Sequence, residues 1–267
     1  MLKHRDLNPP RTTKDTRTRS APRLREVHCV YPRAIGSSHE LPERNCGERI
    51  PDSSVAKAAT LLAQECSAGF LFHHCLRTYV LGRKAGRLLD LKVDDELLYV
   101  ACILHDLGLT SRFEGRERFE VDGADAARAF CIEQAMTAER ADKVWDAVAL
   151  HSTVGIAARN GAEATLVQIG RVRMLGFGEE LLGFGEIRRV MNEVPREDFG
   201  ARFLDVILSL ADRKPVASAW TLVAEIGQQY HGVNCRCPSY RELFPRWVER
   251  IEGTASAHRI AVLTKDR

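Results

Sequence analysis

Apolar residues recur every three or four positions along most of the chain after residue 50, which is the period of amphipathic helices. The pattern predicts helices that begin at Asp52 or Ser53, after Ser67 and at Asp94 or Asp95, the last of them ended by Gly108. Further helices are predicted over about 122–135, 137–151, 162–175, 186–194, 200–227 and 240–252, with Pro215 dividing the longest. No period-two alternation is sustained. The pattern therefore predicts an all-α fold.

Residues 1–49 lack this periodicity. They contain eleven lysines and arginines against six acids, together with proline and serine. Such a composition is typical of a chain segment that cannot bury enough apolar surface to fold. We expect a disordered basic leader over 1–49, a helical core over 50–255 and a C-terminal tail over 256–267.

Composition narrows the class of protein. Apolar residues make up 45% and charged residues 28% of the chain, as in ordinary globular proteins. The net charge of +3 is too small, and the aromatic content of 7% too unpatterned, to favour a nucleic-acid partner. No apolar run approaches the roughly 18 residues that cross a bilayer. Eight cysteines without a secretory signal indicate reduced thiols and a cytoplasmic location.

The strongest chemical pattern is a histidine on one helix and a His-Asp pair at the end of the next: His74, then His105 and Asp106. Adjacent helical residues diverge by about 100°, so His105 and Asp106 share an ion only if the helix ends there. Imidazole and carboxylate donors suit zinc, iron or manganese. A lone helical histidine is more often a hydrogen-bonded structural residue, and an isolated His-Asp pair has little weight.

The surrounding segments give the pattern its weight. They are IPDSSVAKAATLL, FHHCLRTYVLG, DDELLYVACILHDLGLT, RFEVDGADAARAF and VWDAVALHS. With the H…HD spacing they resemble the HD-domain superfamily of metal-dependent hydrolases, and within it the cyanamide hydratase-like branch, over roughly residues 50–210. The resemblance implies a compact multi-helix HD bundle and a divalent metal, zinc in the characterised hydratases. It also implies water addition to a nitrile, which converts cyanamide to urea.

The resemblance also implies roles for single residues. His74 falls on the first ligand position because it precedes C-L-R, which matches the family's S-x-R, and His105 and Asp106 match the defining pair. Thr110 matches a pocket threonine, and His151 lies in a segment that closes the pocket. With Asp106 these two form the expected catalytic set.

Three more residues are expected to bind substrate: His73, at a position usually held by asparagine, Arg77, one turn beyond the first ligand, and Asp122. Simpler roles compete with two of the pocket assignments. Asp122 could cap the helix that it opens, and His151 could interact with the dipole of a helix C-terminus.

The chain departs from the family at the last ligand. That ligand is an aspartate in a D-V-x-G-like tetrapeptide, and the corresponding residues here are Arg173-Met174-Leu175-Gly176. Arginine stays protonated and cannot ligate a cation. Three outcomes are open: a substitute ligand such as Glu163, Glu179 or His151; an ion pair between Arg173 and Asp106 in place of the metal; or a three-ligand site with Arg173 in solvent.

The leading functional hypothesis is a metal-dependent hydratase or hydrolase for a small, polar, nitrile- or amide-like substrate, with no nucleic-acid or membrane partner and a homo-oligomer left open. One alternative is a nucleotide phosphohydrolase, in which Arg77, Arg112, Arg116 and Arg173 would hold phosphate. The other is a catalytically silent binding module. Cys235 and Cys237 with His231 could form a second metal site, although incidental loop cysteines are the simpler interpretation.

Overall fold

Polar side chains begin the helices where the sequence predicts them. Ser53 Oγ accepts the backbone N–H of Ala56 at the start of α1 (Ser54–Cys66). Asp94 accepts two N–H groups at the start of α3 (Asp95–Leu104), and Thr137 accepts one at the start of α5 (Ala138–Leu150). Each cap satisfies donors that have no partner within the helix.

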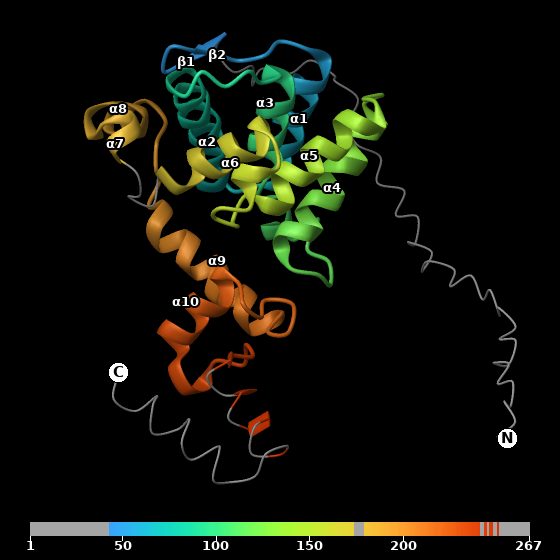
Figure 1. Ribbon diagram of the computed structural model, residues 1–267, viewed down its shortest axis with the longest axis vertical. Helices are drawn as coiled ribbons and strands as arrows, with labels where there is room; N and C mark the ends of the chain where they lie inside the picture. The colour runs from blue at the N-terminus through green and yellow to red at the C-terminus, as the bar shows by residue number, and fades with distance from the viewer. Residues whose placement is uncertain (1–42, 174–178, 241–242, 245, 248–249, 251–267) are drawn as a thin grey trace, which may run out of the picture. The chain divides into compact units, whose positions relative to one another are not determined.

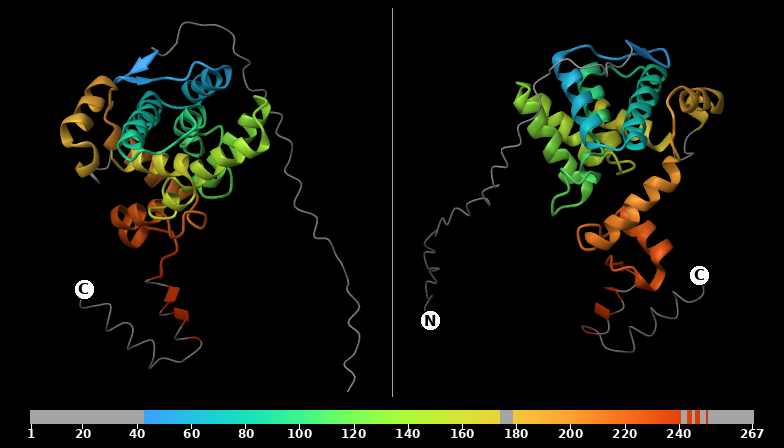
Figure 2. Two further views of the ribbon diagram at one scale, coloured as in Figure 1. Left: turned by 45° about the horizontal axis from the view of Figure 1, so that its top comes forward. Right: turned by 180° about the vertical axis from the view of Figure 1, so that it is seen from behind.

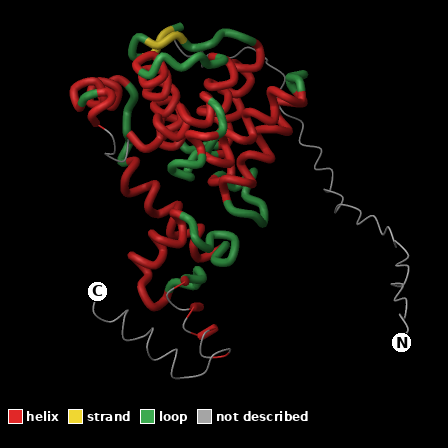
Figure 3. Tube along the Cα trace, viewed as in Figure 1, coloured by secondary structure: helices red, strands yellow, loops and turns green. Residues whose placement is uncertain are grey.

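The computed structural model describes residues 43–173, 179–240, 243–244, 246–247 and 250, with the side chains of 173 and 179 left out of the description. All of these residues lie in the same compact unit. Within them the fold is all-α, as predicted, with ten α-helices (Figures 1 and 3). The remaining helices are α2 (Gly69–Leu88), α4 (Phe119–Glu133), α6 (Ala162–Arg173), α7 (Glu179–Leu182), α8 (Phe184–Glu193), α9 (Phe199–Arg213) and α10 (Leu222–His231). Three 3-10 turns, η1 (Leu107–Leu109), η2 (Ala157–Arg159) and η3 (Gly232–Asn234), complete the helical set.

Helices α2 and α6 lie in close contact, side by side in both views of Figure 2. A Cβ added at Gly170 would lie 2.1 Å from the carbonyl oxygen of Thr78, and one at Gly82 would lie 2.7 Å from that of Leu166. Only glycine allows backbones to approach so closely. The contact fixes the face that α6 presents to the rest of the bundle.

Helix α3 is the buried centre of the bundle. Every residue from Leu97 to Leu104 is buried, and the helix packs against α1, α2, α5 and α6. A short helix that is apolar on all sides is stable only when neighbouring helices cover it completely. The His-Asp pair follows directly after this helix and is therefore delivered into the protein interior.

The C-terminal helices pack on the same core. As predicted, Pro215 lies between two helices, α9 and α10. A cluster of buried apolar residues joins them to α2, η1 and α4: Phe70, Leu71, Leu109, Phe119, Phe199, Ile207, Leu210, Ala211, Val223, Ala224 and Cys237. Helix α9 thus closes over the end of α2 that carries His74.

Regular structure starts before the expected boundary at residue 50. Strands β1 (Arg44–Asn45) and β2 (Glu48–Arg49) form a short antiparallel hairpin. Glu48 is buried beneath it and pairs with Lys84, at 3.5 Å, and with Arg87, both on α2. Strands of two residues are too short to produce an alternating pattern, which explains why the sequence did not reveal them.

Two other boundaries differ from expectation. Helix α4 begins at Phe119 rather than near residue 122, and α3 ends at Leu104, before Gly108. Gly108 instead lies in η1, where an added Cβ would lie 2.0 Å from the carbonyl oxygen of Phe119. Glycine is needed at position 108 because the backbone there packs closely on α4. The leader up to residue 42, most of the helix predicted over 240–252 and the tail over 256–267 lie outside the described residues.

Candidate metal centre

Three donor atoms converge where α2 passes the end of α3. His74 projects from α2, and His105 and Asp106 follow the last turn of α3, so the helix ends at the pair as the sequence required. The two histidine Nε2 atoms are 3.1 Å apart, and each is 3.3 Å from Asp106 Oδ2. The predicted set of three residues is therefore assembled.

Backbone carbonyls orient two histidine rings in this region. His105 Nδ1 donates to the carbonyl oxygen of Cys102 at 2.7 Å, and His151 Nδ1 donates to that of Val148 at 2.6 Å. A carbonyl only accepts, so the proton of each neutral ring lies on Nδ1 and Nε2 keeps its lone pair. His151 Nε2 lies 3.7 Å from Asp106 Oδ1 and has no hydrogen-bond partner among the described residues.

Burial makes the centre electrostatically sensitive, since all four side chains are at most 3% exposed. Burial lowers the pKa of His74 to about 4 and that of His151 to about 3. Burial also opposes the charged forms of His105 and Asp106, but their mutual attraction outweighs it. The pKa of His105 is raised well above its usual range, and that of Asp106 is held well below its own.

The donor set fits a divalent metal. Ligand atoms about 2.0–2.1 Å from a tetrahedral zinc ion lie about 3.3 Å from one another, which matches the separations of 3.1 and 3.3 Å found here. Asp106 Oδ2 also has no hydrogen-bond partner among the described residues. Within the described part of the chain, His74, His105 and Asp106 are the one group of three whose donor atoms could hold an ion.

Aromatic rings cover the centre. Phe199, at the start of α9, stacks on His74 with ring centroids 4.6 Å apart and an interplanar angle of 10°. Phe119 meets His151 edge to face at 5.6 Å. Rings in these positions exclude water from the donors, which strengthens every charge interaction among them.

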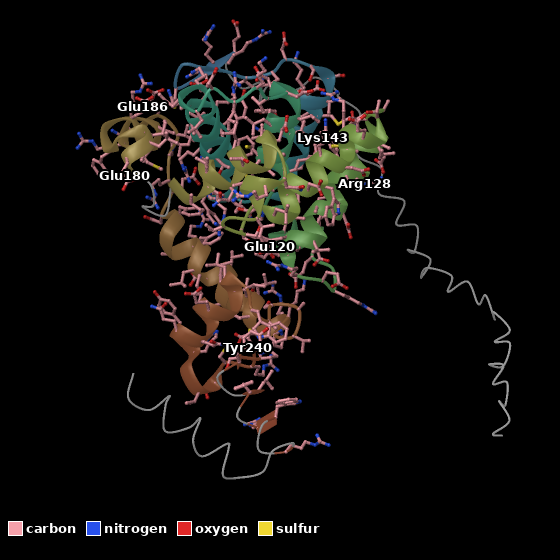
Figure 4. The ribbon with its side chains drawn as sticks, in the orientation of Figure 1. Glu120, Arg128, Lys143, Glu180, Glu186 and Tyr240 are labelled. Carbon is pink, nitrogen blue, oxygen red and sulfur yellow. The ribbon has the colours of Figure 1, made fainter. Side chains whose placement is uncertain are left out.

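Glu120 adds a second buried carboxylate beside His151. It lies at the beginning of α4 (Figure 4) and is fully buried. Arg118 donates to both of its oxygens, at 2.8 and 3.1 Å, and Ser152 Oγ donates at 2.5 Å. Burial opposes the charge of Glu120, but these donors and His151 keep its pKa below the usual range. Glu120 is thus charged and already balanced by its own arginine.

Arg171, on α6, is the residue that the sequence reasoning missed. It is 7% exposed, and its charge acts on both Asp106 and Glu120. Its position could have been found from helical spacing, because Ala164, Val167 and Gln168 precede it at intervals of three and four and are also buried.

The structure shows where some of the residues expected to replace the last metal ligand lie. Glu163 accepts the backbone N–H of Asp94 at 3.0 Å. It therefore lies at the opposite end of α3 from the pair, about 15 Å of helix away. The side chains of Arg173 and Glu179 lie outside the described residues. Of the two named substitutes whose side chains the structure describes, His151 is the one that lies near Asp106.

The residues expected to contact substrate have identifiable structural partners. Thr110 Oγ1 donates to the carbonyl oxygen of Leu107 at 2.6 Å, and Asp122 accepts the N–H groups of Gly115 and Glu117 and pairs with Lys214. Asp122 lies inside α4, whose N-cap is Arg118, so the capping alternative was wrong; the carboxylate of Asp122 instead orders the loop before the helix. Roles of Thr110 and Asp122 in substrate binding stay predictions.

His73 and Arg77 lie on α2 beside the start of α9. His73 Nδ1 pairs with Glu197 Oε1 at 2.7 Å, and Arg77 donates to the carbonyl oxygens of Val194 and Pro195. Arg77 is fully buried and stands over the ring of Phe199. Both residues hold in place the segment that carries Phe199. Their contact with a substrate stays a prediction.

Fold and centre together define a class: an all-α protein with a buried His-His-Asp cluster able to bind a divalent metal. The comparison with known protein families agrees with this class. Residues 71–182 match the family model of the HD domain, which supports membership of the HD superfamily. HD domains bind divalent metals and are usually metal-dependent hydrolases. No curated protein matches the chain. No helix in the described residues is both long and apolar enough to cross a membrane.

Proposed function

We propose that this protein is a metal-dependent hydratase or hydrolase in which His74, His105 and Asp106 hold a divalent ion, zinc in the first place and iron or manganese as alternatives. The observation that carries the proposal is the meeting of three donor atoms at 3.1–3.3 Å from two helices. An ion bound there would lower the pKa of a coordinated water and polarise a substrate.

The surrounding side chains would position the reactants. His151 Nε2 carries a lone pair that is directed at the centre. The pKa of His151, about 3, makes this nitrogen a hydrogen-bond acceptor rather than a strong base at neutral pH. It would accept a hydrogen bond from water or from a donor group of the substrate. Thr110 would orient the substrate, as its place in the resembling family implies.

The first substrate class is a small, polar nitrile or amide, on the resemblance to the cyanamide hydratase-like branch. The second is a phosphate ester, favoured here by one specific observation, the buried side chain of Arg171, whose positive charge acts on Asp106. Guanidinium groups bind phosphate oxygens through paired hydrogen bonds.

The test begins with metal content. The full chain should take up zinc, iron or manganese stoichiometrically on reconstitution, and Asp106→Asn should not. The loaded protein is then assayed against a panel of nitriles and amides and a panel of phosphate esters, with Glu139→Gln, an exposed site on α5, as the control variant. A wild-type chain that binds no metal after reconstitution, or turnover that survives Asp106→Asn, would refute the proposal.

A further inference from the structure

The donors of the metal centre are closed off from solvent. His74, His105 and Asp106 are all buried, and the ring of Phe199 stacks directly on that of His74, with centroids 4.6 Å apart. The ring of Phe119 covers the other side of the centre. A substrate therefore reaches the donors only when one of the covering elements moves.

The two covering rings differ in how firmly the backbone holds them. The carbonyl oxygen of Phe119 lies where a Cβ of Gly108 would be, so α4 is in backbone contact with η1 and Phe119 is fixed. Phe199 instead follows residues 195–198, which are exposed and lie outside the helices. The movable cover is therefore Phe199.

The backbone just before Phe199 is strained. Glu197 has φ 50° and Asp198 has φ 57°, in the left-handed region that residues with a Cβ occupy at a cost in free energy. Among the non-glycine residues that the structure describes, they are the one consecutive pair with positive φ. The side chain of Asp198 makes no capping hydrogen bond to α9 that would offset this cost. Such a conformation persists only while surrounding contacts maintain it, and its release is favourable once they break.

The contacts that maintain it are unequal at the two ends of the segment. At the first end the buried Arg77 donates to the carbonyl oxygens of Val194 and Pro195, at 3.3 and 2.5 Å, and fixes them on α2. At the second end Glu197 Oε1 pairs with His73 Nδ1 at 2.7 Å, and both side chains are partly exposed. Ion pairs in contact with water contribute little stability. The segment is thus firmly held at 194–195 and weakly held at 197.

We propose that Phe199 is the gate of the metal centre and that Glu197 and Asp198 form the hinge on which it opens. When the backbone at the hinge leaves the left-handed region, the first turn of α9 carries Phe199 away from His74, and metal, substrate and product pass through the opening. When it closes, the ring excludes water from the donors. The inference rests on the proposed function in taking the covered centre to be the place of reaction.

The first experiment follows amide hydrogen exchange in the metal-free full chain at low, increasing concentrations of denaturant. The amides of Phe199 and Arg202 donate to the carbonyl oxygens of Arg196 and Asp198. They should exchange through a local opening whose free energy is nearly independent of denaturant, whereas the amides of α3 should exchange only through global unfolding. The same denaturant dependence at both places would overturn the inference, whether or not metal binds.

The second experiment loads the full chain with zinc and measures the rate at which an excess of chelator removes it. Asp198→Val places a β-branched residue, which resists the left-handed region, at the hinge, and should speed removal about tenfold. Asp198→Asn tolerates that region and should match wild type. Asp90→Val is the matched control, because Asp90 is exposed and has φ 50° beyond the end of α2. It imposes the same strain away from the hinge and should leave the rate unchanged.

The outcomes separate this inference from the proposed function. Zinc removal at the wild-type rate from Asp198→Val, while thermal unfolding shows a folded variant, overturns the gate and leaves the metal centre intact. An equal acceleration in Asp90→Val also overturns it, because strain anywhere in the chain would then loosen the site. Local opening at Phe199 in a chain that takes up no zinc supports the gate and refutes the metal-dependent function.

Discussion

The Nε2 atoms of His74 and His105 face each other at 3.1 Å across the junction of α2 and α3. The Nδ1 proton of His105 is committed to Cys102, so its Nε2 lone pair is directed at another nitrogen. Two nitrogen lone pairs at this distance require a proton or a cation between them. Asp106 Oδ2, at 3.3 Å from both, supplies the negative charge that stabilises either.

Asp106→Asn should destabilise the metal-free protein, because it leaves His105 buried beside two other rings without its carboxylate. Breaking a buried ion pair from one side costs about 3–5 kcal/mol. Chemical denaturation of the metal-free chain measures the loss. Asp125→Asn, which alters an exposed carboxylate on α4 that accepts from Trp145, should cost far less. Equal losses in the two variants would contradict a charged pair at the centre.

Lowering the pH should destabilise the folded protein, and His151 sets part of the pH range over which this occurs. Burial lowers its pKa to about 3, whereas the unfolded chain binds that proton near pH 6.5. The unfolded state therefore binds more protons between these values, and stability falls as the pH is lowered through them, by up to about 1.4 kcal/mol per pH unit. In His151→Gln the slope of unfolding free energy against pH should be shallower over this interval. An unchanged slope would show that His151 is protonated in the folded state.

Gly108→Ala should destabilise the fold, since the added Cβ would meet the carbonyl oxygen of Phe119 at 2.0 Å and force η1 away from α4. Overpacking of this kind costs about 1–3 kcal/mol. Gly185→Ala is the matched control, because its Cβ enters open space within α8, and it should stabilise by about 0.5–1 kcal/mol. Thermal unfolding compares the two. A neutral Gly108→Ala would mean that η1 and α4 are not in backbone contact.

The hairpin of β1 and β2 should contribute to the stability of the helical core. Removal of residues 1–49 deletes Glu48, the buried partner of Lys84 and Arg87, whereas removal of residues 1–42 retains it. The longer truncation should therefore unfold more easily, by at least the about 1–3 kcal/mol of an unsatisfied buried group. In the full chain, the point variant Glu48→Gln should show part of the same loss of unfolding free energy. Equal unfolding free energies of the two truncations would contradict a stabilising role of the hairpin.

How far the sequence predicts this protein depends on the range of the interactions involved. Helix starts at Ser53, Asp94 and Thr137 follow from contacts between residues two or three apart, which the sequence displays directly. The start of α4 and the role of Gly108 follow from packing between separate elements, and there the predictions were displaced or wrong. The hairpin of β1 and β2 depends on α2 for the partners of Glu48, so local pattern could not reveal it.

The sequence by itself determined the helical class, the caps that begin the helices and the three residues able to hold a metal, because periodicity and donor chemistry are local properties. Only the tertiary structure decided that Arg171 is buried with its charge acting on Asp106, that His151 lies near Asp106, and that Phe199 covers His74. Each of these depends on how helices distant in the chain are rotated against one another. That rotation is set by the close contact of Gly82 and Gly170 with facing backbone, which no single helix encodes.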